Sequence, residues 1–206
     1  MSYFKHLRDK IRYSPFPRIF IDALDRLGIQ IHLIYLTQEG ITEGLSRPEQ
    51  NELEGYEVRF LGSEDMMEMA KIPYRVASYE ELQSRLKDGN LCLGAKRNGR
   101  LVAFTWCNLT RCTSEGFPFP LNDDEAYLFD AYTASDSRGQ GLAPGLRYRL
   151  YKELARMGRT KLYSVTDRYN TPALRFKLKL GAVILKSSWH ITLFKRWDFG
   201  PKCQRP

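Results

Sequence analysis

Two glycines occur where a predicted strand ends and a predicted helix begins, in the segment Ser137-Arg138-Gly139-Gln140-Gly141-Leu142-Ala143. Glycine lets the backbone approach a ligand without a Cβ in the way. The N-terminus of a helix offers N–H groups that no carbonyl of that helix accepts, together with the positive end of the helix dipole. The segment therefore predicts a cradle for a polyphosphate, made of backbone amides and the charge of Arg138.

The flanking residues predict the strand and the helix that hold this cradle. Residues 125–133 form a short run rich in apolar and aromatic side chains, which is typical of a strand. After the cradle, leucines recur at every fourth position, with basic residues on the other faces of an amphipathic helix: Leu142, Leu146, Leu150 and Leu154, with Arg147, Arg149, Lys152 and Arg156. Pro144 is compatible with the first turn of that helix.

Two common nucleotide-binding loops fit the segment poorly. A Walker loop ends in Gly-Lys-Ser/Thr, whereas Leu142 and Ala143 follow Gly141 here. A dinucleotide fingerprint needs a small third residue, and Pro144 occupies that position. An ordinary glycine-bearing turn stays open as the plain alternative.

The pattern R-x-x-G-x-A, formed by Arg138, Gly141 and Ala143, resembles the acetyl-CoA signature of the GNAT acyltransferase superfamily, Q/R-x-x-G-x-G/A. A second motif resembles the N-x-x-A, aromatic helix and Leu-Gly pattern of that family, at the family's distance: Asn170, Ala173, Phe176, Leu180 and Gly181. The resemblance covers residues 56–196. It implies an α/β (α+β) fold, a GNAT-like mixed, splayed β-sheet flanked by helices, here with an N-terminal helical and strand extension.

The resemblance also implies the co-substrate, acetyl-CoA or another acyl-CoA, and no metal. The amides of the cradle would hold the pyrophosphate: Arg138, Gly139, Gln140, Gly141, Leu142 and Ala143. The strand edge formed by Ala131, Tyr132 and Thr133 would align the pantetheine arm and supply an N–H group for the thioester oxygen. Asn170 and Phe176 of the second motif would complete the cofactor site.

Two protons must move when a thioester acylates an amine. Asp130, a carboxylate in an otherwise apolar strand, is the candidate base, because burial would raise its pKa; a salt-bridged structural aspartate is the alternative. For the acid, the family commonly has a tyrosine seven residues after the motif's Asn, where this chain has Lys177. Lys177 is the candidate acid or a solvated helix residue, and the nearby Tyr169 is a substitute.

The composition of the chain argues for an anionic ligand and against several other classes of function. The 206 residues carry a formal net charge of +8, which attracts anions such as coenzyme A. Nucleic acid is not expected, because the sequence has no helix-turn-helix or RNA-binding signature. The four cysteines form no CxxC pair and the histidines are far apart, so no metal site is expected. Without a bilayer-spanning stretch or a signal sequence, a cytoplasmic location is expected.

The chain divides into an N-terminal extension (1–55), the acyltransferase-like domain (56–197) and a loose tail (198–206). The extension is expected to hold helices at residues 2–13 and 18–27, a strand at 29–36 and a linker. The first helix, from Ser2 to Tyr13, is amphipathic and basic; packing on its own domain is favoured over a membrane surface. Within the domain, Ser78 and Glu81 predict a capping box and Asn98-Gly99 a hairpin, with two closing strands at 182–186 and 189–194.

The function expected from these features is transfer of an acetyl or related acyl group from acyl-CoA to a primary amine by direct transfer. The alternatives are a non-catalytic CoA-binding sensor or assembly module, and a long-chain acyl or aminoacyl transferase on the same fold. The acceptor would be a small-molecule or polymer-linked amine, and Lys71, Arg75 and Lys186 suggest that it is acidic or phosphorylated. His190 is read as a structural strand residue rather than a substrate contact.

Overall fold

The computed structural model of the protein describes residues 24, 27–40, 53–73, 77–114, 116–194 and 196–201. Two compact units divide these residues. The glycine-loop unit comprises residues 40–112 and 120–163, and the terminal unit comprises residues 1–39, 113–119 and 164–206. The predicted helix at 2–13, most of the one at 18–27, most of the linker and Arg75 lie outside the described residues.

The glycine-loop unit contains a four-stranded antiparallel sheet in the order β7-β4-β3-β2. The strands are β2 (Glu57–Phe60), β3 (Leu91–Arg97), β4 (Arg100–Asn108) and β7 (Glu125–Thr133). Asn98 and Gly99 form the turn between β3 and β4, with positive φ angles of 52° and 75°. The predicted Asn-Gly hairpin is therefore confirmed. Two short strands, β5 (Arg111–Cys112) and β6 (Phe119–Pro120), interrupt the long loop before β7.

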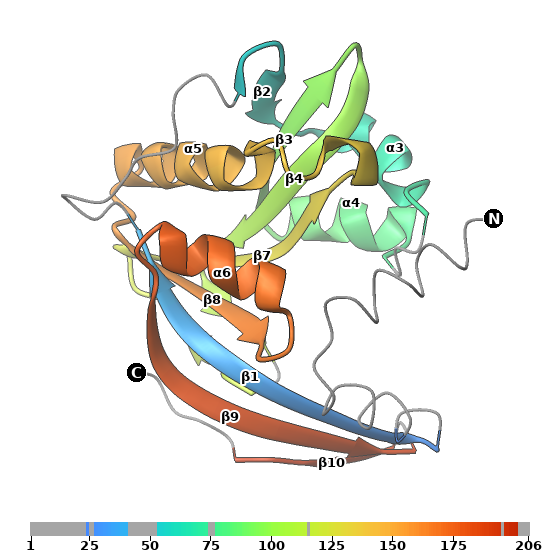
Figure 1. Ribbon diagram of the computed structural model, residues 1–206, viewed down its shortest axis with the longest axis vertical. Coiled ribbons are helices and arrows are strands. Elements are labelled where there is room, and N and C mark those ends of the chain that lie inside the picture. The colour runs from blue at the N-terminus through green and yellow to red at the C-terminus, as the bar shows by residue number, and fades with distance from the viewer. Residues whose placement is uncertain are drawn as a thin grey trace. The chain divides into compact units, whose positions relative to one another are not determined.

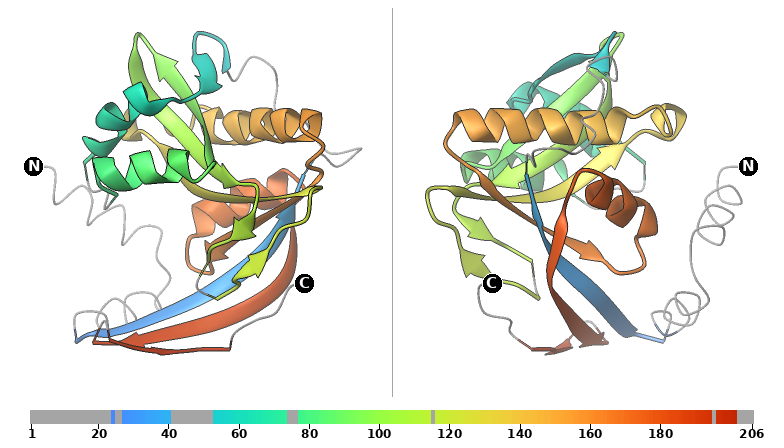
Figure 2. Two further views of the ribbon diagram at one scale, coloured as in Figure 1. Left: turned by 180° about the vertical axis from the view of Figure 1, so that it is seen from behind. Right: turned by 60° about the vertical axis from the view of Figure 1, so that its left-hand side comes forward.

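Helices cover both faces of this sheet (Figures 1 and 2). After the 3₁₀ turn η2 (Ser63–Asp65), α3 (Met66–Ala70) and α4 (Tyr79–Lys87) bury their apolar residues in one cluster with Phe104 and Trp106. The helix α5 (Leu142–Arg156) meets Thr105, which points to the opposite face because side chains alternate along a strand. Half of the predicted capping box of α4 is confirmed: the Ser78 side chain accepts a hydrogen bond from the Glu81 amide at 3.2 Å, whereas the Glu81 carboxylate accepts one from Arg85.

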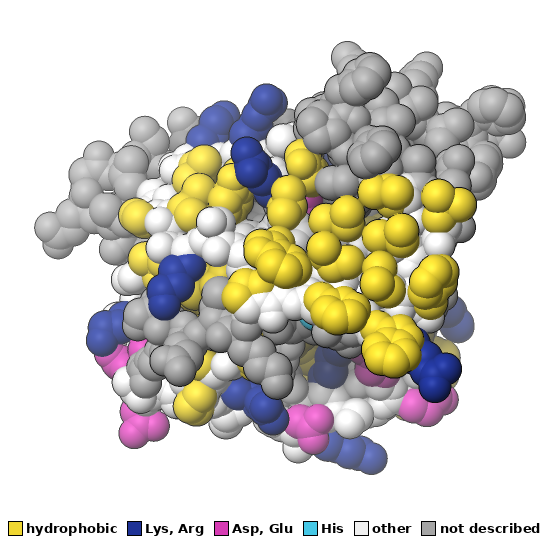
Figure 3. Space-filling model, turned by 90° about the horizontal axis from the view of Figure 1, so that it is seen from below, with side chains coloured by type: hydrophobic (Ala, Val, Ile, Leu, Met, Phe, Trp, Pro, Cys, Tyr) yellow, Lys and Arg dark blue, Asp and Glu magenta, His cyan; other side chains and the backbone are white. Residues whose placement is uncertain are grey.

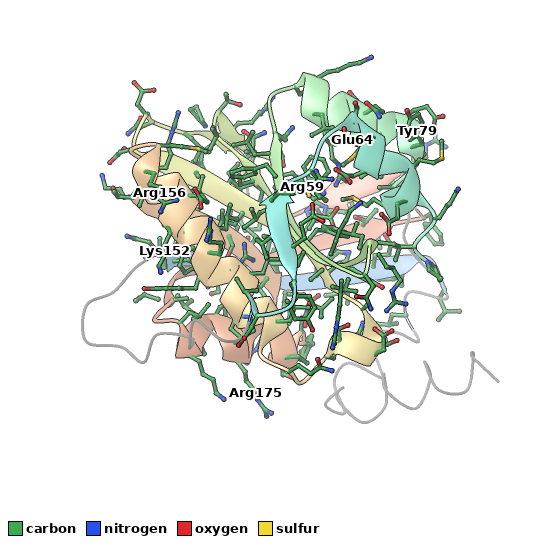
Figure 4. The ribbon with its side chains drawn as sticks, turned by 90° about the horizontal axis from the view of Figure 1, so that it is seen from above. Arg59, Glu64, Tyr79, Lys152, Arg156 and Arg175 are labelled. Carbon is green, nitrogen blue, oxygen red and sulfur yellow. The ribbon has the colours of Figure 1, made fainter. Side chains whose placement is uncertain are left out.

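Two charged side chains of this unit are buried. Arg147 was expected on the polar side of α5, but it is 3% exposed and donates to the Thr105 hydroxyl. Asp65 is 2% exposed and accepts from Arg59 and Lys96. Arg59 also lies 3.5 Å from Glu64, whereas Lys152 and Arg156 extend from the outer side of α5 (Figure 4).

The terminal unit contains strands in the order β10-β9-β1-β8. These are β1 (Ile29–Glu39), the end of β8 (Lys161–Asp167), β9 (Val183–Leu193) and β10 (Trp197–Phe199), with α6 (Thr171–Lys179) between β8 and β9 in the sequence. The two predicted closing segments are both strand, but the break predicted between them is wrong, because β9 runs continuously through Ser187 and Ser188. Its antiparallel partner is β1, from the N-terminal part of the chain (Figure 1).

Candidate functional site

The loop after β7 adopts the backbone that its glycines allow. A 3₁₀ turn, Ser135–Ser137, follows the strand, and α5 begins at Leu142. Gly139 has φ 79° and Gly141 has φ 77°, both in the left-handed region that side-chain-bearing residues rarely adopt. Gly141 is the residue that caps the start of α5, so its conformation sets the direction in which the first amides of the helix point.

The amides of residues 138–143 are available to a ligand. Within the described residues, no backbone or side-chain oxygen accepts a hydrogen bond from them. The first amide to bond back is that of Gly145, which donates to the Gly141 carbonyl at 3.0 Å, whereas the Ser137 amide is already used by Ala134. An anion-binding cradle requires this arrangement of unused amides at the positive end of a helix.

Charged and polar side chains surround the cradle. Arg138 is exposed and its Nε donates to the Thr133 carbonyl at 3.1 Å, which holds the guanidinium beside the strand end. The nearby Asp136 carboxylate is paired with Arg100, and this hydrogen bond lowers the pKa of Asp136 from its ordinary value. Gln140 accepts from the Tyr56 hydroxyl at 3.3 Å. The pairing of Asp136 reduces its repulsion of an incoming phosphate.

A β-bulge interrupts β7 at the predicted base. Phe104 is paired with Tyr132 and Trp106 with Phe129, so Thr105 alone faces both Asp130 and Ala131. Asp130 has φ 45°, a strained conformation for a residue with a side chain. Strand β7 is buried up to the bulge and partly exposed after it. The bulge therefore marks where Ala131, Tyr132 and Thr133 become accessible, because bulges bend a strand and redirect its side chains.

Asp130 is held by an arginine that the sequence pattern did not reveal. Arg85 of α4 donates to Asp130 at 2.5 Å and to Glu81 at 2.7 Å. Its guanidinium also lies 5.6 Å from the ring centroids of Trp106 and Phe129. Burial alone would lower the pKa of Arg85, but the bonds to Asp130 and Glu81 outweigh it and raise that pKa. The only sequence signal was the spacing of four residues between Glu81 and Arg85, which predicts a helix ion pair but not a contact with β7.

The predicted residues of the second motif lie in the terminal unit. Asn170 caps α6, because its side chain accepts from the Ala173 amide at 3.3 Å. The Tyr169 amide donates to Asp167 at 2.8 Å, and Tyr169 and Phe176 are half-buried. Capping thus gives Asn170 a structural role whether or not it contacts a cofactor.

Lys177 is buried rather than solvated, so the solvated alternative is wrong. It is 4% exposed, and its Nζ lies 2.7 Å from Ser164 Oγ, 2.5 Å from Thr166 Oγ1 and 3.5 Å from Glu39 Oε1. Glu39, at the end of β1, is also 4% exposed. A buried lysine needs such a partner, because an unpaired buried charge is costly. Nothing in the sequence pattern linked Glu39 to Lys177.

Other candidate chemistry finds little support. Burial raises the pKa of the Cys107 thiol to about 12, which removes it as a nucleophile. In the part of the chain that the structure describes, no three His, Cys, Asp or Glu side chains gather as metal ligands would. Of the residues suggested for the acceptor, Lys71 is exposed after α3, and Lys186 and His190 are half-buried on β9.

Comparison with protein families gives one match. A sequence model described as the acetyltransferase (GNAT) family matches residues 61–182, more than half of the chain. That stretch contains the bulge, the glycine loop and Asn170. No protein with a curated function matches the sequence significantly.

Solved structures share the fold at low identity. A GNAT-family acetyltransferase from Colwellia psychrerythraea is 16% identical with a TM-score of 0.59, over 80% of this chain and 57% of that one. An N-acetyltransferase-like protein from Streptococcus suis is 13% identical with a TM-score of 0.54, over 84% and 66%. The ribosomal-protein-S18-alanine N-acetyltransferase of Escherichia coli is 22% identical with a TM-score of 0.51, over 61% and 76%. The chain spans 56% to 66% of four such structures.

Proposed function

Because the chain belongs to the acetyltransferase (GNAT) family, we propose that it transfers an acetyl or related acyl group from acyl-CoA to a primary amine. The observation that carries the proposal is the run of amides at residues 138–143 without a protein acceptor, at the start of α5. These amides and Arg138 would bind the pyrophosphate of coenzyme A. Gly139 and Gly141 keep the approach clear of side chains.

The bulged strand would position the thioester. Ala131, Tyr132 and Thr133 follow the bulge and are the residues proposed to align the pantetheine arm, with a backbone N–H bonded to the thioester oxygen. Asn170 and Phe176 are proposed to complete the cofactor site from the second motif. Most of the acceleration would come from holding the amine and the thioester together.

Two proton transfers complete the reaction. The ammonium loses a proton to Asp130, the amine nitrogen attacks the thioester carbonyl, the C–S bond breaks, and the thiolate takes up a proton. Lys177 is proposed as the acid only if its contact with Glu39 loosens during turnover, and Tyr169 is the substitute. The proposed acceptor is a small-molecule or polymer-linked amine with an acidic or phosphorylated group, which Lys71, Arg75 and Lys186 would favour electrostatically.

A CoA-binding sensor is the second candidate, and the burial of Lys177 favours it. The family's usual tyrosine is replaced by a lysine that already bonds Ser164, Thr166 and Glu39. A chain that keeps the cradle but lacks an available acid would bind acyl-CoA and turn it over slowly.

Ligand analysis followed by an acceptor screen separates the two candidates. Mass spectrometry of the purified protein should detect co-purified CoA or an acyl-CoA. Calorimetry should then measure affinity for acetyl-CoA, a long-chain acyl-CoA and free CoA. Chromatography should detect CoA released in the presence of simple, acidic and phosphorylated amines. Release with an amine supports the transferase, tight binding without release by any amine supports the sensor, and absence of binding contradicts both.

A further inference from the structure

One face of the strands β1, β9 and β10 is apolar along its whole described length. Side chains of paired residues point to the same face, and every second residue along a strand returns to it. The pairings place the following rows on this face: Ile29, Leu193 and Trp197; Ile31, Ile191 and Phe199; Leu33 and Trp189; Tyr35 and Ser187. None of these ten residues, here called the apolar sheet face, is charged.

The large aromatic side chains of the apolar sheet face, except Tyr35, are exposed, and its aliphatic residues are half-buried. Trp189 is 46% exposed, Trp197 57% and Phe199 49%. Figure 3, which looks at these strands from below, shows hydrophobic side chains gathered over a broad area. The opposite face carries Gln30, His32 and Lys186, and there Gly116 packs so closely on Ile34 that a Cβ would lie 2.3 Å from Ile34 Cδ1. Proteins rarely leave an apolar area of this kind open unless it binds something.

The sequence on either side of these strands is basic, which suits an anionic partner. Residues 1–28, which lead into β1, carry six Lys or Arg against three Asp or Glu. Residues 195–206, which follow β9, carry four against one. The Arg196 guanidinium lies 5.9 Å from the ring centroid of Trp197, so a cation adjoins the aromatic row. Exposed tryptophans beside basic residues are the pattern with which proteins bind the headgroup region of anionic membranes.

We propose that the apolar sheet face binds the surface of an anionic lipid bilayer, with Trp189, Trp197 and Phe199 as its anchors. No described helix is long and apolar enough to cross a bilayer. A second copy of the chain fits less well. Seven residues each of β1 and β9 and the short β10 (Trp197–Phe199), about 4.8 Å apart, cover roughly 300 Å² in projection, a small area for a stable dimer, which buries ~800 Å² of accessible surface per partner. This proposal does not depend on the acyltransferase proposal.

Vesicle binding by the full chain tests the proposal. The wild type should co-sediment with vesicles of phosphatidylcholine and phosphatidylglycerol and not with phosphatidylcholine alone. The double variant Trp189→Ser/Trp197→Ser should bind about tenfold more weakly or worse. Leu178→Ser is the matched control, because Leu178 is 44% exposed on α6, and it should bind as the wild type does. Neither change should alter acetyl-CoA affinity.

Further measurements distinguish lipid binding by the apolar sheet face from lipid binding by the N-terminal segment and from self-association. The variant Leu7→Asp/Ile11→Asp alters the predicted N-terminal helix; loss of binding in this variant, with binding kept in the tryptophan variant, would overturn the proposal. Absence of vesicle binding by the wild type would also overturn it, as would tryptophan-dependent self-association in sedimentation without lipid binding. Quenching of wild-type tryptophan fluorescence by brominated lipid should occur, and needs no variant to fold; its absence counts against the proposal.

Discussion

The Nη1 atom of Arg85 lies 2.5 Å from Oδ2 of Asp130, so an arginine of α4 holds the one residue of β7 that has a positive φ angle. The bond ties the bulge to the helix that covers this face of the sheet. It also provides the structural partner that the alternative interpretation of Asp130 required.

Replacing Asp130 with asparagine separates these two roles. If Asp130 is the base, Asp130→Asn should lower kcat about 100-fold or more and remove the acidic limb of the pH–rate profile. Asp123→Asn is the control, because Asp123 is exposed in the loop before β7. A variant that loses stability in urea but keeps its kcat and profile would leave Asp130 a purely structural residue.

Gly141→Ala should weaken acyl-CoA binding more than it weakens the fold. Alanine is strained at φ 77°, at a cost of about 1 kcal/mol, and its Cβ enters the space beside the cradle. Gly158→Ala is a matched control: Gly158 has φ 80°, lies just beyond α5, and a Cβ there would meet nothing within 4 Å. Calorimetry with acetyl-CoA should show lost affinity for the first variant alone. Equal affinities would argue against the cradle.

The buried pair of Lys177 and Glu39 should contribute strongly to stability. Either Lys177→Met or Glu39→Gln alone leaves one buried charge without its oppositely charged partner. Each change should lower the free energy of unfolding by about 3 to 5 kcal/mol. The double variant should lose clearly less than the sum of the two, as a double-mutant cycle in urea would measure. If Lys177 is also the acid, Lys177→Met should reduce kcat with little change in acetyl-CoA affinity. Additive losses of stability would mean that the two side chains do not interact.

Acid should destabilise the protein through Asp65. Bonds from Arg59 and Lys96 outweigh the cost of burying this carboxylate and lower its pKa from 3.8 to about 2. Because the folded-state pKa lies below the unfolded one, the stabilisation is complete above pH 4 and is lost as the pH falls toward 2, about 2 kcal/mol in all. Asp65→Asn should remove this part of the pH dependence in urea unfolding. If the slope of unfolding free energy against pH does not change in this variant, the pKa of Asp65 is not lowered in the folded protein.

Local patterns predicted those parts of the protein whose determinants are close in sequence. The Asn98-Gly99 hairpin, the Ser78 cap and the leucine stripe of α5 each depend on residues within a few positions of one another, and the structure has all three. The α/β fold was implied by the resemblance of the two motifs to those of the GNAT family.

Contacts between distant segments escaped prediction. Arg147 belongs to a regular polar stripe, and only the position of Thr105 on the facing strand shows why it is buried. Ser187 and Ser188 suggested a turn, but pairing with Tyr35 and Ile34 keeps them in β9. Arg85 and Glu39 likewise form ion pairs with residues distant in the sequence, Asp130 and Lys177. A single sequence carries no direct record of such pairings.

The pairing of β1 with β9 has a consequence for synthesis on the ribosome. Ile29 is synthesised well before its partner Leu193, because most of the described residues lie between them in the sequence. The apolar segment that forms β1 therefore stays unpaired with β9 until the residues between them have been synthesised. Pairing between segments so far apart in the sequence slows folding, and until it occurs the unpaired strand is prone to aggregate.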